Sequence, residues 1–192
     1  HLRSNKEPQF DLLLRFLKNL SQDAQPRRLT EKKALLGPSG QKPLKQGLFL
    51  LGDIFDLWIG RYHTFIKQWE PLIELLKELA AMNFSIHYFE GNHDLYLRKY
   101  WQDQLGFAVH REPQYFEIGS RRVRAEHGDL MNPRDYGYRT LRTVLRFPIT
   151  QFLLENLSER LIIALGETMS HTSRQMTTKG AKAQSAEAAS FI

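Results

Sequence analysis

The chain has 192 residues, 42% of them hydrophobic and 25% charged, which is the composition of a globular protein with one sizeable core and excludes a largely disordered chain. It has no cysteine, which excludes disulfides and thiolate metal sites, and it has no apolar run of about 18 residues that would predict a membrane-spanning helix. The formal net charge of +6 favours an anionic partner, and nucleic acid, a nucleotide lipid and an acidic membrane all meet that description.

The first predicted element is an amphipathic helix over residues 8–20. One face of this helix should pack on a sheet, because its apolar residues recur at helical spacing: Phe10, Leu13, Leu14, Leu17 and Leu20. Residues 21–46 are rich in lysine and arginine and contain Gly37-Pro38-Ser39-Gly40, which predicts a long basic loop. This loop is compatible with a solvated surface and also with an electrostatic contact to lipid headgroups or nucleic acid.

A β-α-β arrangement follows the basic loop. Residues 48–51 form a continuous apolar run, as expected of a strand buried on both faces, and residues 85–90 form the next strand. Between them, residues 72–80 repeat apolar side chains at helical spacing, and Pro71 suits the first turn of that helix. This order predicts parallel strands joined by a right-handed crossover, and hence the α/β class. Shorter strands are expected over residues 107–110, 115–118 and 122–125, with Gly119-Ser120 as the turn between the last two.

Three potential metal ligands, Asp53, Asn92 and His127, each follow one of these strands. Open α/β sheets bind ligands at the carboxyl ends of their strands, and carboxylate, amide oxygen and imidazole suit Mn, Mg, Fe or Zn. The layout is that of a two-metal phosphoesterase, in which a carboxylate shared by two cations about 3.5–4 Å apart helps to activate one water while the cations bind phosphate oxygens. Asp53 has the position of the shared carboxylate.

Ionisable residues beside these ligands are candidates for supporting roles. His93 is next to Asn92, and its imidazole can protonate the leaving oxygen or bind the phosphate as a cation. Asp94 can orient His93, while Asp56 and Asp129 can hold ligands as acceptors around the metal site. Each of these aspartates is equally compatible with a helix cap or a turn. The other histidines lack such a context and are expected to be structural or on the surface: His63, His87, His110 and His171.

Residues from 134 onward predict two helices separated at Pro148, which would form a cap over the site. Arg139, Arg142 and Arg146 fall on one side of the first helix. Such a stripe is compatible with a solvated face and, next to a phosphate site, with contact to the substrate. The apolar residues of the two helices are expected to face inward.

The motifs together resemble the calcineurin-like metallophosphoesterase superfamily, and two stretches resemble one family within it. Residues 52–60, Gly-Asp-Ile-Phe-Asp-Leu-Trp-Ile-Gly, are similar to a pattern of the UDP-2,3-diacylglucosamine diphosphatases (pyrophosphohydrolases), and so is His127-Gly-Asp129 followed by Asp135-Tyr-Gly-Tyr138 and Arg142. The resemblance implies an α/β layered metallophosphoesterase sandwich of mixed β-sheets flanked by helices. It also implies an incomplete core over residues 1–132, a helical cap insertion over 133–172 and the start of a return segment over 173–192.

The resemblance further implies that the chain is a fragment. Members of the superfamily begin with Asp-x-His at the end of a first strand and close with Gly-His-x-His, and this sequence lacks the closing pair. His1 would be the histidine of the first motif, although an arbitrary chain start is the alternative. The implied cofactors are two divalent ions, first Mn, with Mg, Fe or Zn as alternatives, held by His1, Asp53, Asn92 and His127. Residues 1–192 alone are therefore expected to bind metals poorly.

The reaction implied by the resemblance is the hydrolysis of UDP-2,3-diacylglucosamine to UMP and 2,3-diacylglucosamine 1-phosphate in lipid A biosynthesis. Asp135, Tyr138 and Arg142 are the implied substrate-binding residues, and the partner would be an anionic nucleotide lipid. The implied location is cytoplasmic, peripherally on the inner membrane of a Gram-negative-type cell, whose anionic surface suits a basic protein.

Two features depart from that family pattern. The well-known branch has Gly-Asn-Arg-Asp where this chain has His93, and segment 21–46 looks like an insertion. The alternatives are a generic phosphodiesterase, a nucleotide pyrophosphatase or a nuclease with the same metals, for which nucleic acid would be the partner. A remoter alternative is a non-catalytic binding module on the same fold.

Overall fold

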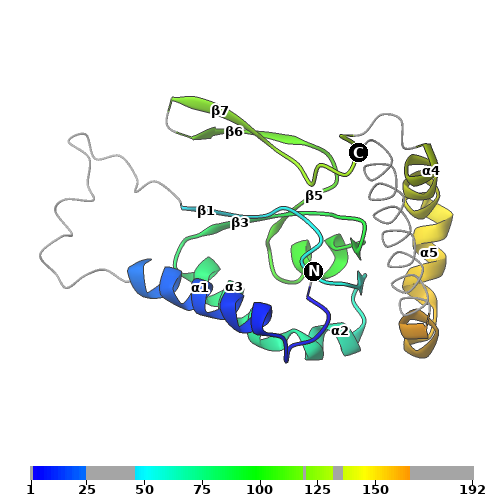
Figure 1. Cartoon of the computed structure of the whole chain (residues 1–192), viewed down its shortest axis with the longest axis horizontal. Coiled ribbons are helices and arrows are strands. Elements are labelled where there is room, and N and C mark those ends of the chain that lie inside the picture. The colour runs from blue at the N-terminus through cyan, green and yellow to red at the C-terminus, as the bar shows by residue number, and fades with distance from the viewer. Residues whose placement is uncertain (1, 25–45, 119, 132–135, 165–192) are drawn as a thin grey trace, which may run out of the picture.

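A three-stranded parallel sheet forms the centre of the computed structural model, which describes residues 2–24, 46–118, 120–131 and 136–164 (Figure 1). Its strands are β1 (Gly47–Leu50), β3 (Ser85–Phe89) and β5 (Ala108–His110), in the order β1-β3-β5. The parallel pairing predicted from the β-α-β order is confirmed. The expectation that residues 48–51 are buried on both faces was wrong, because Leu48 and Phe49 are only partly buried and Leu51 is 46% exposed. Within the described residues, β1 lies at the edge of the sheet beside β3.

Helices cover one face of this sheet (Figure 1). Helix α1 (Pro8–Ala24) contains the predicted helix and runs one further turn, and α3 (Glu70–Ala81) begins with Pro71 in its first turn, as predicted. The short helix α2 (His63–Gln68) precedes α3. The apolar stripes meet in the core, where Phe10 packs edge-on against Trp69. The basic loop expected after α1 lies outside the described residues from position 25 to 45.

An antiparallel hairpin lies over the opposite face of the sheet (Figure 1). It consists of β6 (Gln114–Ile118) and β7 (Arg121–Ala125), which match two predicted strands, while Gly119 of the predicted turn is outside the described residues. Phe116 of β6 contacts the rings of Phe49 and His87 on the sheet. The described chain is thus mixed α/β, with small parallel and antiparallel sheets; the layered metallophosphoesterase sandwich itself stays a prediction.

A cluster of aromatic rings fills the region beneath the strand ends. Trp58, fully buried, stacks on Phe55 and packs against Trp101, and its indole Nε1–H donates to Gly60 O at 2.9 Å. Trp58 belongs to β2 (Trp58–Ile59), which pairs in parallel with β4 (Asp94–Leu95), and Trp101 lies in the π-helical turn η1 (Arg98–Gln102). This cluster fixes the segments on either side of Asp53 and Asn92.

The start of the described chain runs beside residues 54–56. Leu2 forms a parallel bridge with Phe55, donating its N–H to Ile54 O at 2.8 Å and accepting from Asp56 N at 2.7 Å. The residue before Leu2, His1, is outside the described residues.

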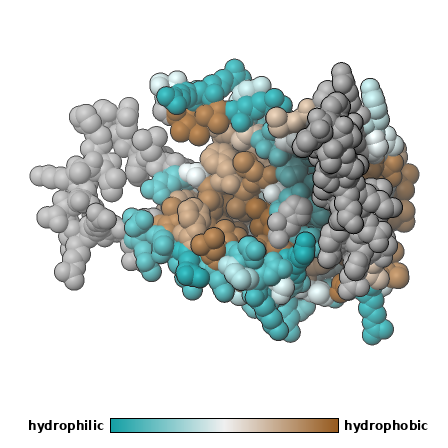
Figure 2. Space-filling view, in the orientation of Figure 1, coloured by the Kyte–Doolittle hydropathy of each residue, from teal (hydrophilic) through white to brown (hydrophobic). Residues whose placement is uncertain are grey.

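The predicted pair of cap helices is present as α4 (Tyr136–Leu145) and α5 (Pro148–Asn156), and residues 159–164 add a further helical turn. Tyr62 fastens α5 to the core, because its hydroxyl lies 2.5 Å from Leu154 O and 2.8 Å from Leu157 O and can donate its one hydrogen to either carbonyl. The expected inward apolar face was only partly right. Leu145, Leu154, Leu157 and Ile162 pack inward, but a larger apolar set is exposed on the outer edge (Figure 2): Tyr136, Leu141, Val144, Phe147, Ile149, Phe152, Leu153 and Leu161. No helix in the described ranges is long and apolar enough to cross a bilayer.

Candidate metal centre

Two tight loops meet at Asp53. Gly52 and Asp53 both have positive φ, +82° and +52°, and the Asp53 N–H donates to Asp94 Oδ1 at 2.8 Å. Left-handed backbone is uncommon for a non-glycine residue and is found where the surrounding structure enforces it. The second loop enters at Gly91, where an added Cβ would overlap Asp53 Oδ1 and lie 2.5 Å from Asp53 N. Only glycine allows the second loop to approach the Asp53 carboxylate this closely.

The Asp53 carboxylate is oriented by the backbone of the second loop. Its Oδ1 accepts hydrogen bonds from the N–H groups of Asn92 at 2.9 Å and His93 at 3.0 Å. Its Oδ2 lies 3.5 Å from His127 Nε2, and the Asp53 side chain is only 13% exposed. Asp53 therefore presents one oxygen to the loop and the other to the third predicted ligand.

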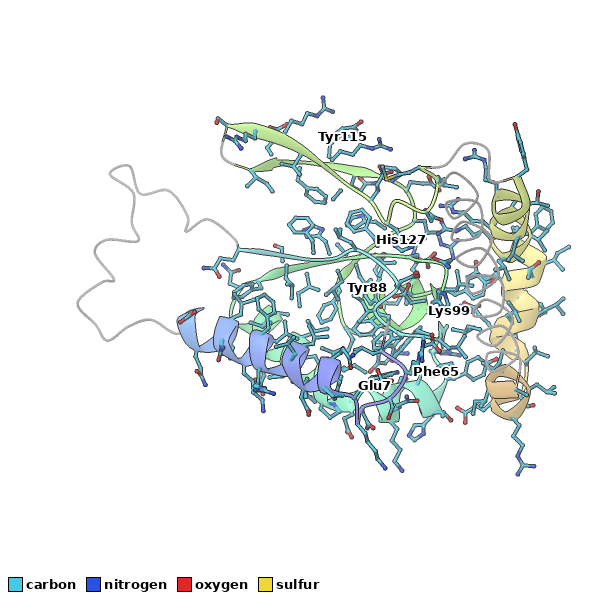
Figure 3. The ribbon with its side chains drawn as sticks, in the orientation of Figure 1. Glu7, Phe65, Tyr88, Lys99, Tyr115 and His127 are labelled. Atoms are coloured by element: carbon cyan, nitrogen blue, oxygen red, sulfur yellow. The ribbon has the colours of Figure 1, made fainter. Side chains whose placement is uncertain are left out.

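The tautomer of neutral His127 follows from its backbone contact. His127 comes directly after β7 and Glu126, where the hairpin returns toward the parallel sheet (Figure 3). Its Nδ1 lies 2.7 Å from Leu51 O, and because a carbonyl can only accept, Nδ1 carries the hydrogen. The lone pair is then on Nε2, which lies 3.1 Å from Asn92 Oδ1. A backbone carbonyl that fixes one ring nitrogen while the other faces a metal is the usual arrangement of histidine ligands.

The three predicted ligands therefore converge. The Asn92 amide can meet the other two with either end: turned nitrogen-inward it donates to His127 Nε2 at 3.1 Å and to Asp53 Oδ2 at 2.9 Å. Turned oxygen-inward, the amide places Asn92 Oδ1 beside Asp53 Oδ2 and His127 Nε2, so that three atoms with lone pairs face one another. A cation bound between them would make this arrangement favourable. Two ligand atoms each about 2.1 Å from one ion lie about 3 Å apart at a right angle, so these separations fit a shared divalent ion. Within residues 2–24, 46–118, 120–131 and 136–164, no three His, Cys, Asp or Glu side chains form a cluster, so the amide of Asn92 is needed to complete a set of three.

Asp94 supports the two loops from below. Its side chain is fully buried, and its carboxylate accepts from Asp53 N, Ile54 N and Gly91 N at 2.8–3.0 Å. Tyr88 adds a fourth bond, donating its hydroxyl to Oδ2 at 2.6 Å. Burial raises the pKa of Asp94, against the effect of these donors, and burial followed by the charge of Asp94 raises that of Tyr88 well above 10. Sequence reasoning missed Tyr88, although an inward position on a strand that ends at the motif is a signal for such a partner.

His93 is oriented by Asp56 rather than by Asp94. Its Nδ1 lies 2.9 Å from the backbone carbonyl of Asp56, and its ring is half-buried. The Asp56 carboxylate faces the guanidinium of Arg3 at 4.0 Å. The predicted role of Asp94 in orienting His93 thus belongs, in this geometry, to the carbonyl of Asp56, while Asp94 holds the backbone of the loop.

Helix α4 brings arginines into this region. Arg142, predicted to bind substrate, donates its Nε–H to Asp129 Oδ2 at 2.7 Å, and both side chains are less than one-fifth exposed. Asp129 thereby links the loop of His127 to the cap. The arginine stripe is not simply solvated, because Arg146 is also half-buried while Arg139 is exposed. Of the other predicted substrate-binding residues, Asp135 and the side chain of Tyr138 lie outside the described part.

Two histidines predicted to be structural form a pair away from the ligands. His87 Nδ1 lies 3.0 Å from His110 Nε2, and the two rings stack on each other. Phe49 stacks on His87, and Phe89 and Phe116 pack against the pair at an angle. Burial lowers the pKa of His87, and burial together with the charge of His87 lowers that of His110. The pair lies where the hairpin that leads to His127 packs on the sheet.

Comparison with known proteins agrees with this arrangement. The chain is 31% identical over 139 residues to the UDP-2,3-diacylglucosamine hydrolase of Pseudomonas fluorescens (strain Pf0-1), an overlap of 72% of this chain and 56% of the relative. The corresponding proteins of strain SBW25 and of Stutzerimonas stutzeri (strain A1501) are 32% and 30% identical over 132 residues, 69% of this chain and 53% and 55% of theirs. This chain is homologous to UDP-2,3-diacylglucosamine hydrolases.

The homology confirms the family resemblance deduced from the motifs, and the names of the homologues indicate a hydrolase. The chain spans about half the length of the UDP-2,3-diacylglucosamine hydrolases it matches. No protein-family model matches the chain.

Proposed function

We propose that this chain carries the metal-binding core of a hydrolase that cleaves the phosphoanhydride of UDP-2,3-diacylglucosamine to UMP and 2,3-diacylglucosamine 1-phosphate. The observation that supports it most is the convergence of Asp53 Oδ2, Asn92 Oδ1 and His127 Nε2. The shared name of the relatives supports the choice of substrate. These residues would hold two divalent ions, for which Mn is the first choice, and His1 is a further proposed ligand.

Each protein group has a chemical role in this proposal. Bound divalent ions would supply Lewis acidity and positive charge, which lower the pKa of water and neutralise phosphate oxygens. The carboxylate of Asp53 would bind metal, and the N–H groups of Asn92 and His93 hold it in place. Asn92 contributes a neutral oxygen, which adds no charge that would repel an anionic substrate. His127 presents Nε2 because Nδ1–H is bonded to Leu51 O.

His93 is the proposed catalytic residue. The carbonyl of Asp56 accepts from its Nδ1, so proton exchange with the substrate would take place at Nε2. A protonated imidazole can donate a proton or bind an anion. In its protonated form it would donate to the leaving phosphate oxygen as the bond to the α-phosphorus breaks, or bind the phosphate as a cation.

The cap is the proposed site of substrate recognition. Arg142 lies beside the metal loop through its bond to Asp129, and with Asp135 and Tyr138 it would bind the glucosamine and its phosphate. We also propose a peripheral contact with the cytoplasmic face of an inner membrane, supported by the exposed apolar side chains of α5, such as Phe152 at 65% and Ile149 at 64% exposure, and by the net charge of +6.

A panel assay of the full-length protein with Mn tests the substrate. UDP-2,3-diacylglucosamine, a generic phosphodiester, a cyclic nucleotide and DNA are compared at equal concentration. The proposal expects the lipid nucleotide to be cleaved with the highest kcat/KM and UMP to be released. An intact lipid nucleotide beside rapid cleavage of the generic phosphodiester would refute the substrate while keeping a phosphodiesterase. Preferred cleavage of DNA, with binding that weakens steeply with salt, would identify a nuclease.

Two substitutions of His93 separate its proposed roles. His93→Ala should lower kcat by about 100-fold or more in either role. His93→Arg keeps a cation but gives up an exchangeable proton near neutral pH, so it should retain activity only if His93 binds phosphate. Full activity in His93→Ala would show that His93 has neither role.

A further inference from the structure

Two arginines one helical turn apart, in α4 and just after it, contact the segments that carry His127 and Asn92. Arg142 bonds to Asp129, two residues after His127. Arg146, just past the end of α4, donates from Nη1 to Arg111 O at 3.0 Å and from Nη2 to Glu90 O at 3.5 Å. Glu90 is the residue immediately before Gly91. Arg142 therefore contacts the loop of His127, and Arg146 contacts the residue that leads into the loop of Asn92.

Glu90 is buried and contacts several segments. Its side chain is 1% exposed, Oε1 accepts from Leu97 N at 2.9 Å, and Oε2 lies 3.1 Å from Arg111 Nε. Its own N–H donates to His110 O at 2.8 Å. Burial raises the pKa of Glu90, and the charges of Arg111 and Arg146 oppose that rise. The Glu90 carboxylate contacts Leu97 and Arg111, and its backbone carbonyl accepts from Arg146. These contacts fix the backbone that leads into Asn92 and His93.

A second contact joins the same two segments. The hydroxyl of Tyr96 donates to Leu145 O, the residue before Arg146, and Tyr96 itself has a positive φ of +55°. Positive φ in a buried aromatic residue persists only where neighbouring contacts enforce it. The end of α4 is thus attached at Leu145 and Arg146 to both ends of segment 90–97.

We propose that Arg146 is a positioning residue that acts through Glu90 and Arg111: it holds segment 90–94 in the conformation in which Asn92 and His93 meet Asp53, and so couples the cap to the metal centre. The alternative is that Arg146 merely fastens α4 to the core. The two roles predict different effects of removing the arginine. If Arg146 only fastens α4, its removal loosens the cap and leaves metal affinity unchanged.

The test compares three variants of the full-length protein. Arg146→Met removes the guanidinium and keeps an apolar stem, and Glu90→Gln keeps the bond to Leu97 N while removing the charge. Arg160→Met is the matched control, because Arg160 is an exposed arginine on the same cap. Hydrogen exchange of the amides of residues 91–97, Mn affinity by calorimetry, and kcat and KM are measured for each.

We expect both Arg146→Met and Glu90→Gln to exchange the amides of 91–97 faster than the control. We also expect them to bind Mn about 10- to 100-fold more weakly, with a fall in kcat larger than any rise in KM. Should Arg146→Met fail to fold, Glu90→Gln carries the same expectations.

The proposal is overturned if both variants bind Mn as the control does and only KM rises, since that is the signature of a loosened cap. The Mn and exchange measurements do not depend on the substrate. A protein that leaves UDP-2,3-diacylglucosamine intact would therefore contradict the proposed function without deciding the role of Arg146.

Discussion

The Nε2 atom of His127 lies 3.5 Å from Oδ2 of Asp53, although the two residues follow strands of different sheets. Asp53→Asn replaces a charged carboxylate with a neutral amide, and His127→Ala removes the imidazole. Each should therefore weaken Mn binding in the full-length protein by about 100-fold or more, beyond the loss typical of an outer-sphere partner. Calorimetric titration with Mn measures this. His63→Ala, an exposed histidine on α2, is the control and should bind Mn normally. If both ligand variants bind Mn as tightly as the unchanged protein, the proposed metal centre is refuted.

Gly91→Ala should disturb the same centre without replacing a ligand. The added Cβ would overlap Asp53 Oδ1 and lie 2.6 Å from Asp94 Oδ1, so the loop or the carboxylate has to move. We expect Mn affinity to fall by about tenfold or more and the protein to lose about 1–3 kcal/mol of stability, as for other overpacked sites. Titration with Mn and urea unfolding measure the two effects.

Gly106→Ala is the matched control for Gly91→Ala. Gly106 has φ +75° and nothing within 4 Å of an added Cβ, so alanine there is strained but not crowded. It should cost about 1–2 kcal/mol of stability and leave Mn affinity unchanged. Equal losses of Mn affinity in the two variants would mean that general destabilisation, and not crowding of Asp53, is responsible.

The helices and the ligand positions were predictable because they depend on local patterns. The periodicity of residues 8–20 and 72–80 gave α1 and α3, and the apolar runs before Asp53 and Asn92 gave the strands that bring them together. These signals depend on which side chains recur at helical or strand spacing. The end of α1 was placed short because its last turn, with Ser21, Asp23 and Ala24, has no apolar repeat.

The environment of each element was less predictable. An apolar run identifies a strand but not its place in the sheet, so residues 48–51 were expected to be buried on both faces although β1 is an edge strand of the described sheet. Arg142 and Arg146 share a helix face, but their partners Asp129 and Glu90 come from distant segments. Helical spacing shows which residues share a face and not what that face meets.

The His87–His110 pair predicts that acid destabilises the fold. Lowered pKa values mean that the folded state binds fewer protons than the unfolded state, so this stabilising contribution is present above about pH 6.5 and is lost as the pH falls below it. The raised pKa values of Glu90 and Asp94 act in the opposite direction, but they contribute equally to a protein and its histidine variant.

His87→Gln should therefore lose less stability than the unchanged protein between about pH 7.5 and about pH 5.5. Thermal unfolding measures this, and a difference of 1 kcal/mol corresponds to about 2–4 °C in Tm for a chain of this size. His63→Gln is the control, because His63 is exposed. If His87→Gln and His63→Gln follow the same pH dependence as the unchanged protein, the buried pair does not titrate between the two pH values.

Trp58 is part of the family-like motif, yet its surroundings are those of a core residue. It is fully buried, packs against Phe55, Phe65 and Trp101, and donates to Gly60 O. Trp58→Ala should cost about 3–5 kcal/mol of stability, and Trp58→Phe should cost less because most of the aromatic packing remains. Urea unfolding followed by circular dichroism measures this. In Trp58→Phe the Mn affinity and the KM for the lipid nucleotide should be unchanged. A stable Trp58→Phe protein with a strongly raised KM would instead mean that the indole contacts the substrate, which its burial in the aromatic cluster argues against.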